Sequence, residues 1–304
     1  MFSKEGKKEN TKQSNHFLSK RHTLIGMLLI LPALASLVMF KYFPMILGMF
    51  ISFFKLDLVN MPGPFVGFDN YIRVFQDPDF YASLLNNLKV FIYTMLMNFG
   101  IPIILAILVD EVRRGKTLFR LAYFIPGCVP GIAMMIIWKF FWQPDYGLAN
   151  YIVGLFGVER QMWLNDVNLV YFCLHFPSLV VCGGMNLIIY LSALQDVPQE
   201  LYEAAMIDGA GVRQRLRHIT LPNISGTVYV LFTLQLIGCI NAMENILVMT
   251  GGGPANSTRT VLLHAYRQAT DSMDYSYAIT MITVVYVFTL ILNIFMQRRK
   301  NKEA

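Results

Sequence analysis

The sequence predicts an all-helical integral membrane protein with six transmembrane helices and both termini in the cytoplasm. Composition is the first observation: of 304 residues, 14% are charged and 55% are hydrophobic. Soluble globular proteins carry about 25% charged residues, so a soluble fold of this length would lack the charge to cover its surface. We therefore expect lipid to replace water over much of the exterior. The lengths of the apolar runs and the placement of the basic residues are the other two observations.

Six apolar runs reach the length of about 20 residues that a helix needs to cross a bilayer. The first run contains Lys41, and its second half is too short for another crossing at about 1.5 Å per residue, so one long tilted span is expected there. The sequence thus predicts a six-span domain over residues 23–297, between cytoplasmic tails at 1–22 and 298–304. The expected spans are Thr23–Phe54, Asn87–Val109, Phe119–Trp142, Val167–Leu194, Asn223–Met249 and Tyr277–Gln297.

The basic residues predict the orientation of these spans. Seventeen of the 25 Lys and Arg fall in the two tails and in the loops after spans two and four, while five fall in the opposite loops. Cytoplasmic loops of membrane proteins carry the excess of Lys and Arg, so both termini are expected in the cytoplasm. The net charge of +6 is then a signal of topology, and nucleic-acid binding is not expected.

The search for catalytic chemistry predicts no catalytic residue and no metal site. Paired carboxylates, a nucleophile with a base, and clustered metal ligands are all lacking in the sequence. The Gly-Lys-Thr at 115–117 lacks the earlier glycine and the preceding strand of a phosphate-binding loop. The four cysteines lie in apolar stretches without a C-x-x-C pair, which favours a role as small apolar fillers; they are Cys128, Cys173, Cys182 and Cys239.

The most informative stretch is the loop between spans four and five, residues 195–222. Pro198 suits the first turn of a helix, and good or fair helix formers follow it to Met206. Asp208-Gly209 predicts a helix stop, because glycine adopts positive φ without strain. A second short basic helix is expected at Val212–His218, closed by Leu221-Pro222 before span five.

This loop resembles the EAA signature of permease subunits of bacterial ABC importers. Glu203-Ala204-Ala205 is followed by three residues, Gly209, nine residues, and then Ile219-x-Leu221-Pro222. In that family the loop is the coupling helix that docks in a cleft of the ATPase subunit. The resemblance implies a docking role for Glu203, Ala204, Ala205, Gly209 and Arg213, with Arg215 and Arg217 as flanking contacts.

The same resemblance implies the fold, the location and the partners. The fold would be the type I ABC importer permease architecture in the bacterial cytoplasmic membrane. A second, related permease would complete a heterodimer. Two ATP-binding subunits would hold ATP and Mg, so that this chain itself needs no cofactor. An extracytoplasmic solute-binding protein would deliver the substrate.

Three external motifs narrow the resemblance to the carbohydrate-uptake branch, the maltose, glycerol-phosphate and multiple-sugar permeases. They are Gly67-x-Asp69-Asn70-Tyr71, Pro144-x-x-Gly147-x-x-Asn150 and Thr250-x-Gly252-Gly253-Pro254. Each is weak alone, because Gly, Pro and Asn occur in any loop. Their order along the chain implies a carbohydrate substrate, with a non-sugar solute such as glycerol phosphate as the alternative.

Candidate substrate residues are polar side chains at membrane depth, which usually face a bundle interior or a wet cavity. Asn241, Glu244 and Asn245 are expected on one face of span five at i, i+3 and i+4, with Gln235 earlier in that span and Asn186 in span four. Amides suit sugar hydroxyls, which donate and accept hydrogen bonds. Glu244 could equally hold a loop or bind a partner permease.

Span three carries Pro126, Gly127, Pro130 and Gly131, which predict a bent or closely packed helix. A gating hinge is an alternative role for these residues. A stand-alone ion-coupled transporter is the rival class. It would favour inverted repeats around several intramembrane charges, whereas Glu244 is the one acidic residue in the expected spans. The prediction is therefore a non-catalytic transport subunit.

Overall fold

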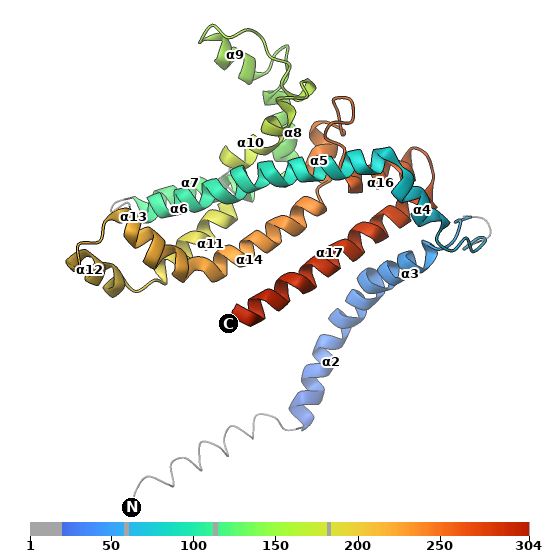
Figure 1. Cartoon of the computed structure of the whole chain (residues 1–304), viewed down its shortest axis with the longest axis horizontal. Coiled ribbons are helices and arrows are strands. Elements are labelled where there is room, and N and C mark those ends of the chain that lie inside the picture. Colours follow the sequence, from blue (N-terminus) through green and yellow to red (C-terminus); the bar gives the residue numbers. More distant parts are fainter. Residues whose placement is uncertain (1–19, 58–60, 112–114, 181–183, 304) are drawn as a thin grey trace, which may run out of the picture. The chain divides into compact units, whose positions relative to one another are not determined.

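The computed structural model describes residues 20–57, 61–111, 115–180 and 184–303, and helices dominate these ranges (Figure 1). Within them the β pairing is an isolated antiparallel bridge between Phe54 and Phe65. Residues 1–19 of the expected tail lie outside the described residues, as do Cys182, Arg113 and Arg114. The chain divides into two compact units, Met1–Gly67 and Phe68–Ala304.

The first unit contains one long helical run. Helix α2 (Lys20–Leu37) passes through a π-helical segment η1 (Val38–Tyr42) into α3 (Phe43–Ile51). The run Ile25–Ile51 counts as a single candidate membrane span of 27 residues. Lys41 lies inside η1 and does not interrupt the helix, which agrees with one long span at this position.

The second unit contains the remaining helices, several of them short. In chain order they are α4 (Asp69–Gln76), α5 (Pro78–Thr94), π-helical η2 (Met95–Gly100), α6 (Ile101–Glu111), α7 (Lys116–Phe124), 3-10 helix η3 (Ile125–Cys128), α8 (Gly131–Phe141), α9 (Leu148–Gly154), 3-10 helix η4 (Trp163–Asn165), α10 (Val170–Val180), α11 (Gly184–Gln195), α12 (Gln199–Ile207), α13 (Val212–Arg215), π-helical η5 (Leu216–Thr220), α14 (Leu221–Ile240), α15 (Glu244–Met249), α16 (Val261–Thr270) and α17 (Tyr275–Glu303).

Four helical runs in the described residues are long and apolar enough to cross a membrane. They are Ile25–Ile51, Pro78–Glu111, Val212–Ile240 and Tyr275–Arg298. The pair Val170–Val180 and Met185–Gln195, bent by 51°, makes a fifth if it forms one span. The expected spans one, two and six are thus found as continuous helices.

The expected spans three and five are interrupted, and span four is the bent pair, so three of the six expected spans are not single continuous helices. In span three, α7 ends at Phe124 and passes into the 3-10 helix η3, and α8 begins at Gly131, so the helix is broken at Val129 and Pro130, where a bend was predicted. The physical reason is that proline removes a backbone donor and clashes with the preceding turn. In span five, α14 ends at Ile240 and α15 begins only at Glu244.

Each of the three π-helical segments ends two residues before a proline. The prolines are Pro44, Pro102 and Pro222, each the second residue of the helix that follows η1, η2 and η5. The residue before each proline bonds five residues back instead of four, as Leu221 does to Leu216. A proline ring clashes with the carbonyl four residues earlier, and widening the turn accommodates it.

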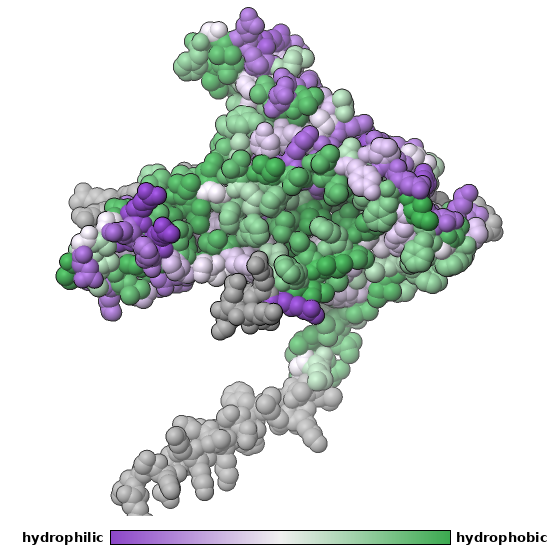
Figure 2. Space-filling model, viewed as in Figure 1, coloured by the Kyte–Doolittle hydropathy of each residue, from purple (hydrophilic) through white to green (hydrophobic). Residues whose placement is uncertain are grey.

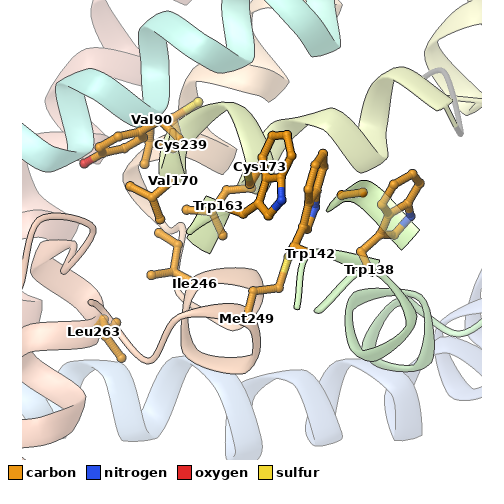
Figure 3. Close-up of a cluster of buried hydrophobic side chains, with 13 residues drawn as sticks. Val90, Trp138, Trp142, Trp163, Val170, Cys173, Cys239, Ile246, Met249 and Leu263 are labelled. Atoms are coloured by element: carbon orange, nitrogen blue, oxygen red, sulfur yellow. The ribbon is translucent and has the colours of Figure 1, made fainter. Parts of the chain in front are cut away.

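Three buried clusters carry the core of the second unit, and one of them joins α4, α5, α16 and α17 through Val74, Phe80, Val261, Ala265, Tyr277 and Met281. Another joins α5, α8, α10 and α15 through Trp138, Trp142 and Trp163 (Figure 3). The remaining cluster, which we call the α6–α11–α14 core, consists of Ala106, Val109, Leu187, Tyr190, Leu191, Leu194, Val197, Ile224 and Leu231. Outside these clusters, large apolar side chains on the long helices are exposed, such as Leu234 and Ile291, as expected for surfaces that face lipid.

Hydrophilic residues gather at the ends of the long helices in the second unit (Figure 2). One such region covers α12 and α13, and another covers the region around α4. Helix α9 carries hydrophilic residues beside apolar ones. Apolar residues cover the lengths of helix between them.

Candidate functional site

Helix α12 is the first part of the candidate site, and its end confirms the predicted stop. Gly209 has φ of +76°. The Gly209 N–H donates to the Met206 carbonyl at 3.1 Å, and the Ala210 N–H donates to the Ala205 carbonyl at 2.8 Å. These two bonds form a Schellman motif, which favours glycine at this position because of its left-handed backbone.

The following segment corrects one detail of the predicted loop. Helix α13 begins after Gly211, whose backbone N–H donates to the side-chain oxygen of Gln214 at 2.9 Å. The basic helix does not close at Leu221-Pro222 but continues through η5 into α14, making one run from Val212 to Ile240. Pro222 occupies the first turn of α14, where a missing N–H costs little.

The side chains of α12 divide sharply by exposure. Tyr202 and Ala205 are half-buried, while the other seven residues of the helix are exposed. Glu203 and Ala204 are therefore accessible, and Ile207 is 87% exposed. Arg213 is exposed on α13. An exposed surface that mixes apolar side chains with a carboxylate is typical of a docking site for another protein.

A pocket of about 500 Å³ lies beside α12, where the ends of α6 and α11 meet η5. Both acidic and basic side chains line it: Asp110, Glu111, Glu203 and Arg215. Tyr202 and Thr220 also line it. The pocket separates α12 from the ends of α6 and α11, so few α12 side chains contact the long helices.

A second pocket of about 380 Å³ lies among the interrupted helices. Three of the five predicted substrate residues line it: Asn186, Gln235 and Asn245. The Pro-Gly break between α7 and α8 forms another part of the wall. The full lining is Asn98, Pro126, Gly127, Val129, Gly131, Met134, Met135, Leu174, Pro177, Ser178, Asn186, Gln235, Asn245 and Met249.

The break after α14 separates the other two predicted residues from this pocket. Asn241 follows the last residue of α14, is exposed, and donates to the Ile237 carbonyl of its own helix at 2.9 Å. Glu244 is the first residue of α15 and is exposed. The expectation that Asn241, Glu244 and Asn245 share one helix face is wrong, because no continuous helix connects them.

Asn98 belongs to this pocket and was missed by the sequence analysis. Pro102 lies four residues later and cannot donate to the Asn98 carbonyl. The Nδ2 of Asn186 donates to that carbonyl instead, at 3.2 Å. The Oδ1 of Asn98 is buried without a hydrogen-bond partner, although buried polar atoms are normally paired. An asparagine four residues before a proline within an apolar run is the signal that could have found it.

Asn87 stabilises the break in span five, and the sequence analysis did not identify it either. Its Nδ2 donates to the Cys239 and Ile240 carbonyls at 2.9 and 3.3 Å, which satisfies the end of α14. Its Oδ1 accepts from the Val261 N–H at the start of α16, at 2.9 Å. One amide of α5 therefore fixes both the end of α14 and the start of α16.

The external motif Pro144-x-x-Gly147-x-x-Asn150 stabilises its own loop. The Asn150 side chain bonds to the carbonyls of Pro144 and Gln161, to the Gln161 N–H and to the Trp163 indole. A side chain at Gly147 would collide with the backbone of Gln143. These residues hold the loop that carries α9.

His264 of α16 is buried against α5, near several charged groups. Its Nδ1 lies 3.5 Å from the Ser83 hydroxyl, and its Nε2 lies 3.2 Å from the side chain of Gln268. Burial lowers the pKa of His264 below its ordinary value of 6.5, and the Arg259 guanidinium lowers it further, while Asp77 and Asp79 oppose this. The neutral ring therefore serves as packing in this cluster.

The family emerges from sequence comparison. Residues 98–300 match the family described as the inner membrane component of binding-protein-dependent transport systems. The chain belongs to this family. It is a permease subunit of an ABC importer, a multi-pass protein of the cytoplasmic membrane.

Individual relatives agree with this assignment. The permease is 30% identical to the trehalose/maltose transport system permease protein MalF of Thermococcus litoralis, over 90% of this chain and 94% of the relative. It is also 30% identical to the sn-glycerol-3-phosphate transport system permease protein UgpA of Yersinia pseudotuberculosis, over 82% and 85%.

A solved structure shares the fold of the permease. It is a bacterial alginate ABC transporter in complex with an alginate pentasaccharide-bound periplasmic protein. The TM-score is 0.82 at 24% identity, covering 93% of this chain and 96% of that one. The permease therefore has the all-helical fold of ABC importer permeases.

Proposed function

We propose that this permease forms half of the translocation path of an ATP-driven carbohydrate importer and receives the ATPase movement through α12. The observation that carries the proposal is the exposed surface of α12, with Glu203 and Ala204 accessible beside an end fixed by Gly209. Ala205 and Arg213 belong to the same contact region. The permease itself catalyses nothing, and ATP and Mg are held by the partner ATPase.

The amide-lined pocket supports a carbohydrate as the substrate. Asn98, Asn186, Gln235 and Asn245 present both donors and acceptors, which match sugar hydroxyls. No charged residue belongs to the lining that the structure describes. A phosphate would leave its charge unpaired there, and an unpaired buried charge is costly, so a neutral carbohydrate is favoured over glycerol phosphate.

The break after α14 changes the roles we propose for the remaining path residues. Glu244 and Asn241 lie outside the pocket lining, and we assign them to an exposed region beside it, where a second permease would pack. The pocket would then be the part of the path contributed by this chain alone. The partner permease would complete the rest.

The topology we propose has six spans with both termini in the cytoplasm. The two broken helix pairs, α7 with α8 and α10 with α11, each count as one crossing. The excess of basic residues in the tails and around α12 supports this orientation. It places α12 on the side of the ATPases and α9 on the side of a solute-binding protein.

The partners we propose are a second permease, two ATP-binding subunits and an extracytoplasmic solute-binding protein. Family membership supports them, and so does the periplasmic protein bound in the alginate transporter. The alternative of a stand-alone ion-coupled transporter has no support from the family comparison.

The experiment is a charge reversal at Glu203 with a matched control at Glu200. Both carboxylates are exposed on α12, so Glu203→Lys and Glu200→Lys make the same change of net charge on the same helix. The tagged permease is purified from membranes in mild detergent, and the Mg·ATP hydrolysis that co-purifies is measured.

We expect Glu203→Lys to lower the co-purified ATPase about tenfold or more, because truncating a central interface charge costs about 2 kcal/mol or more. Glu200→Lys should retain it. Equal ATPase recovery from both variants would overturn the assignment of the α12 surface.

A further inference from the structure

The contact between α12 and the long helices is narrow. Tyr202 and Ala205 are the two α12 side chains that are not exposed. The Tyr202 ring packs against the α6–α11–α14 core, as does Ile219 of η5. Alanine offers little surface, so Tyr202 supplies most of the contact by which α12 can act on the membrane helices.

The Tyr202 hydroxyl reaches Thr220, the buried last residue of η5. Its oxygen lies 3.0 Å from Oγ1 of Thr220. Thr220 is buried, and its hydroxyl donates to the Arg215 carbonyl at 3.5 Å. Either hydroxyl can be the donor in the bond between Tyr202 and Thr220. The bond joins α12 to the last residue of the π-helical segment.

The π-helical segment connects Thr220 directly to α14. Such turns are rare and cluster at functional sites, and this one exists because Pro222 excludes a regular turn. Beyond it, α14 continues without a break to Gln235 in the pocket. At about 1.5 Å per residue, about 22 Å of rigid helix separates Thr220 from Gln235.

We infer that Tyr202 is a positioning residue that transmits displacement of α12 to α14 through its hydrogen bond to Thr220. A pull or push on α12 moves the Thr220 end of η5, and α14 carries the movement to the pocket wall. The inference rests on the proposed contact between α12 and the ATPase. It adds the side chain through which that contact reaches the substrate path.

Two substitutions remove the bond while keeping the packing. Tyr202→Phe deletes the hydroxyl and keeps the ring in the core, and Thr220→Val replaces the hydroxyl by a methyl of the same shape. Thr220→Ser is the matched control, because it keeps the hydroxyl. Neither Tyr202 nor Thr220 lies on the exposed surface assigned to the ATPase, so co-purification of ATPase is expected to stay at the wild-type level.

The measurement follows the pocket directly and needs no knowledge of the sugar. Gln235→Cys is introduced after the native cysteines are replaced, and the whole complex is purified. The rate of maleimide labelling at position 235 is measured with and without Mg and a non-hydrolysable ATP analogue. Coupling energies between sites are typically 1–3 kcal/mol, so nucleotide is expected to change the rate about fivefold or more.

We expect Tyr202→Phe and Thr220→Val each to reduce the nucleotide effect to less than about twofold, and Thr220→Ser to preserve it. The double variant should be no worse than either single variant, because residues that share one bond are not additive. A nucleotide response of wild-type size in Tyr202→Phe would overturn the inference.

The same experiments distinguish failure of the α12 coupling proposal from failure of the role of Tyr202. If the parent complex carrying Gln235→Cys alone lacks ATPase, or shows no nucleotide effect on labelling, the α12 coupling proposal fails. If that complex responds and Glu203→Lys loses the ATPase while Tyr202→Phe responds normally, only the role of Tyr202 is overturned.

Discussion

At the scale of single residues, Gly209 determines how α12 ends. Its φ of +76° lies in the left-handed region, and open space surrounds the position of a Cβ. A side chain there therefore meets backbone strain and no collision. The local sequence was enough to predict this position, because helix stops of this kind depend on one residue and its neighbours.

A matched pair of substitutions tests the role of Gly209. Left-handed backbone costs a residue with a side chain about 1–2 kcal/mol, which corresponds to a factor of about 5–30. Gly209→Ser should lower ATPase co-purification by about that factor. Gly211→Ser should leave it close to the wild-type level, because Gly211 has φ of −70° at the start of α13 and serine is favoured there. Similar losses in both variants would contradict the account.

Asn245 and Asn241 differ in their position relative to the proposed substrate pocket. Asn245 lines the pocket, whereas the Asn241 amide is used by its own helix. We expect Asn245→Ala to reduce uptake of a labelled carbohydrate that the wild-type transporter accumulates by about threefold to tenfold, the size of one hydrogen bond. Asn241→Ala should change uptake less than twofold. A larger loss of uptake in Asn241→Ala than in Asn245→Ala would contradict this assignment and would place the substrate site near Asn241.

At the scale of helices, prolines shape the candidate site. Pro102 frees the Asn98 carbonyl for Asn186, and Pro222 places Thr220 in a π-helical turn beside Tyr202. The prolines are visible in the sequence, yet the partners of the freed groups come from other helices. The position of each distortion could be predicted, and its hydrogen-bond partner could not.

The break in span five shows the same limit more strongly. Residues 241–243 contain no proline or glycine, so periodicity predicts a continuous helix through them. The break depends on Asn87, which lies 152 residues away from Cys239 and bonds to the last carbonyls of α14. Tertiary contacts of this kind outweigh local preference, and sequence pattern alone contains no sign of them.

Removing the Asn87 amide tests this explanation. Asn87→Leu loses three hydrogen bonds and leaves the Ile240 carbonyl and the Val261 N–H unpaired, whereas the Cys239 carbonyl keeps the backbone N–H groups of Asn241 and Ala242. The loss is expected to destabilise the fold by about 2–4 kcal/mol. Asn241→Leu loses one exposed bond and should cost less than about 0.5 kcal/mol. Thermal unfolding of the purified permease in detergent measures both. Equal midpoints would show that Asn87 does not hold the break.

At the scale of the whole molecule, composition and charge placement were enough to predict the membrane class. They could do so because insertion into lipid depends on the average hydrophobicity and charge of whole segments, and not on contacts between particular residues. The pocket combines residues from five separate stretches, 98, 126–135, 174–186, 235 and 245–249. Such a set forms only when the helices pack, so sequence spacing found three of its amides and misplaced two other residues.

The central claim is that ATP hydrolysis drives a carbohydrate through this permease by way of α12. The most direct measurement reconstitutes the purified transporter with its solute-binding protein in proteoliposomes and follows uptake of labelled carbohydrate. We predict that uptake requires Mg·ATP on the ATPase side, persists when proton and sodium gradients are dissipated, and is lost in Glu203→Lys. Uptake that proceeds without ATP and follows an imposed ion gradient would contradict the account.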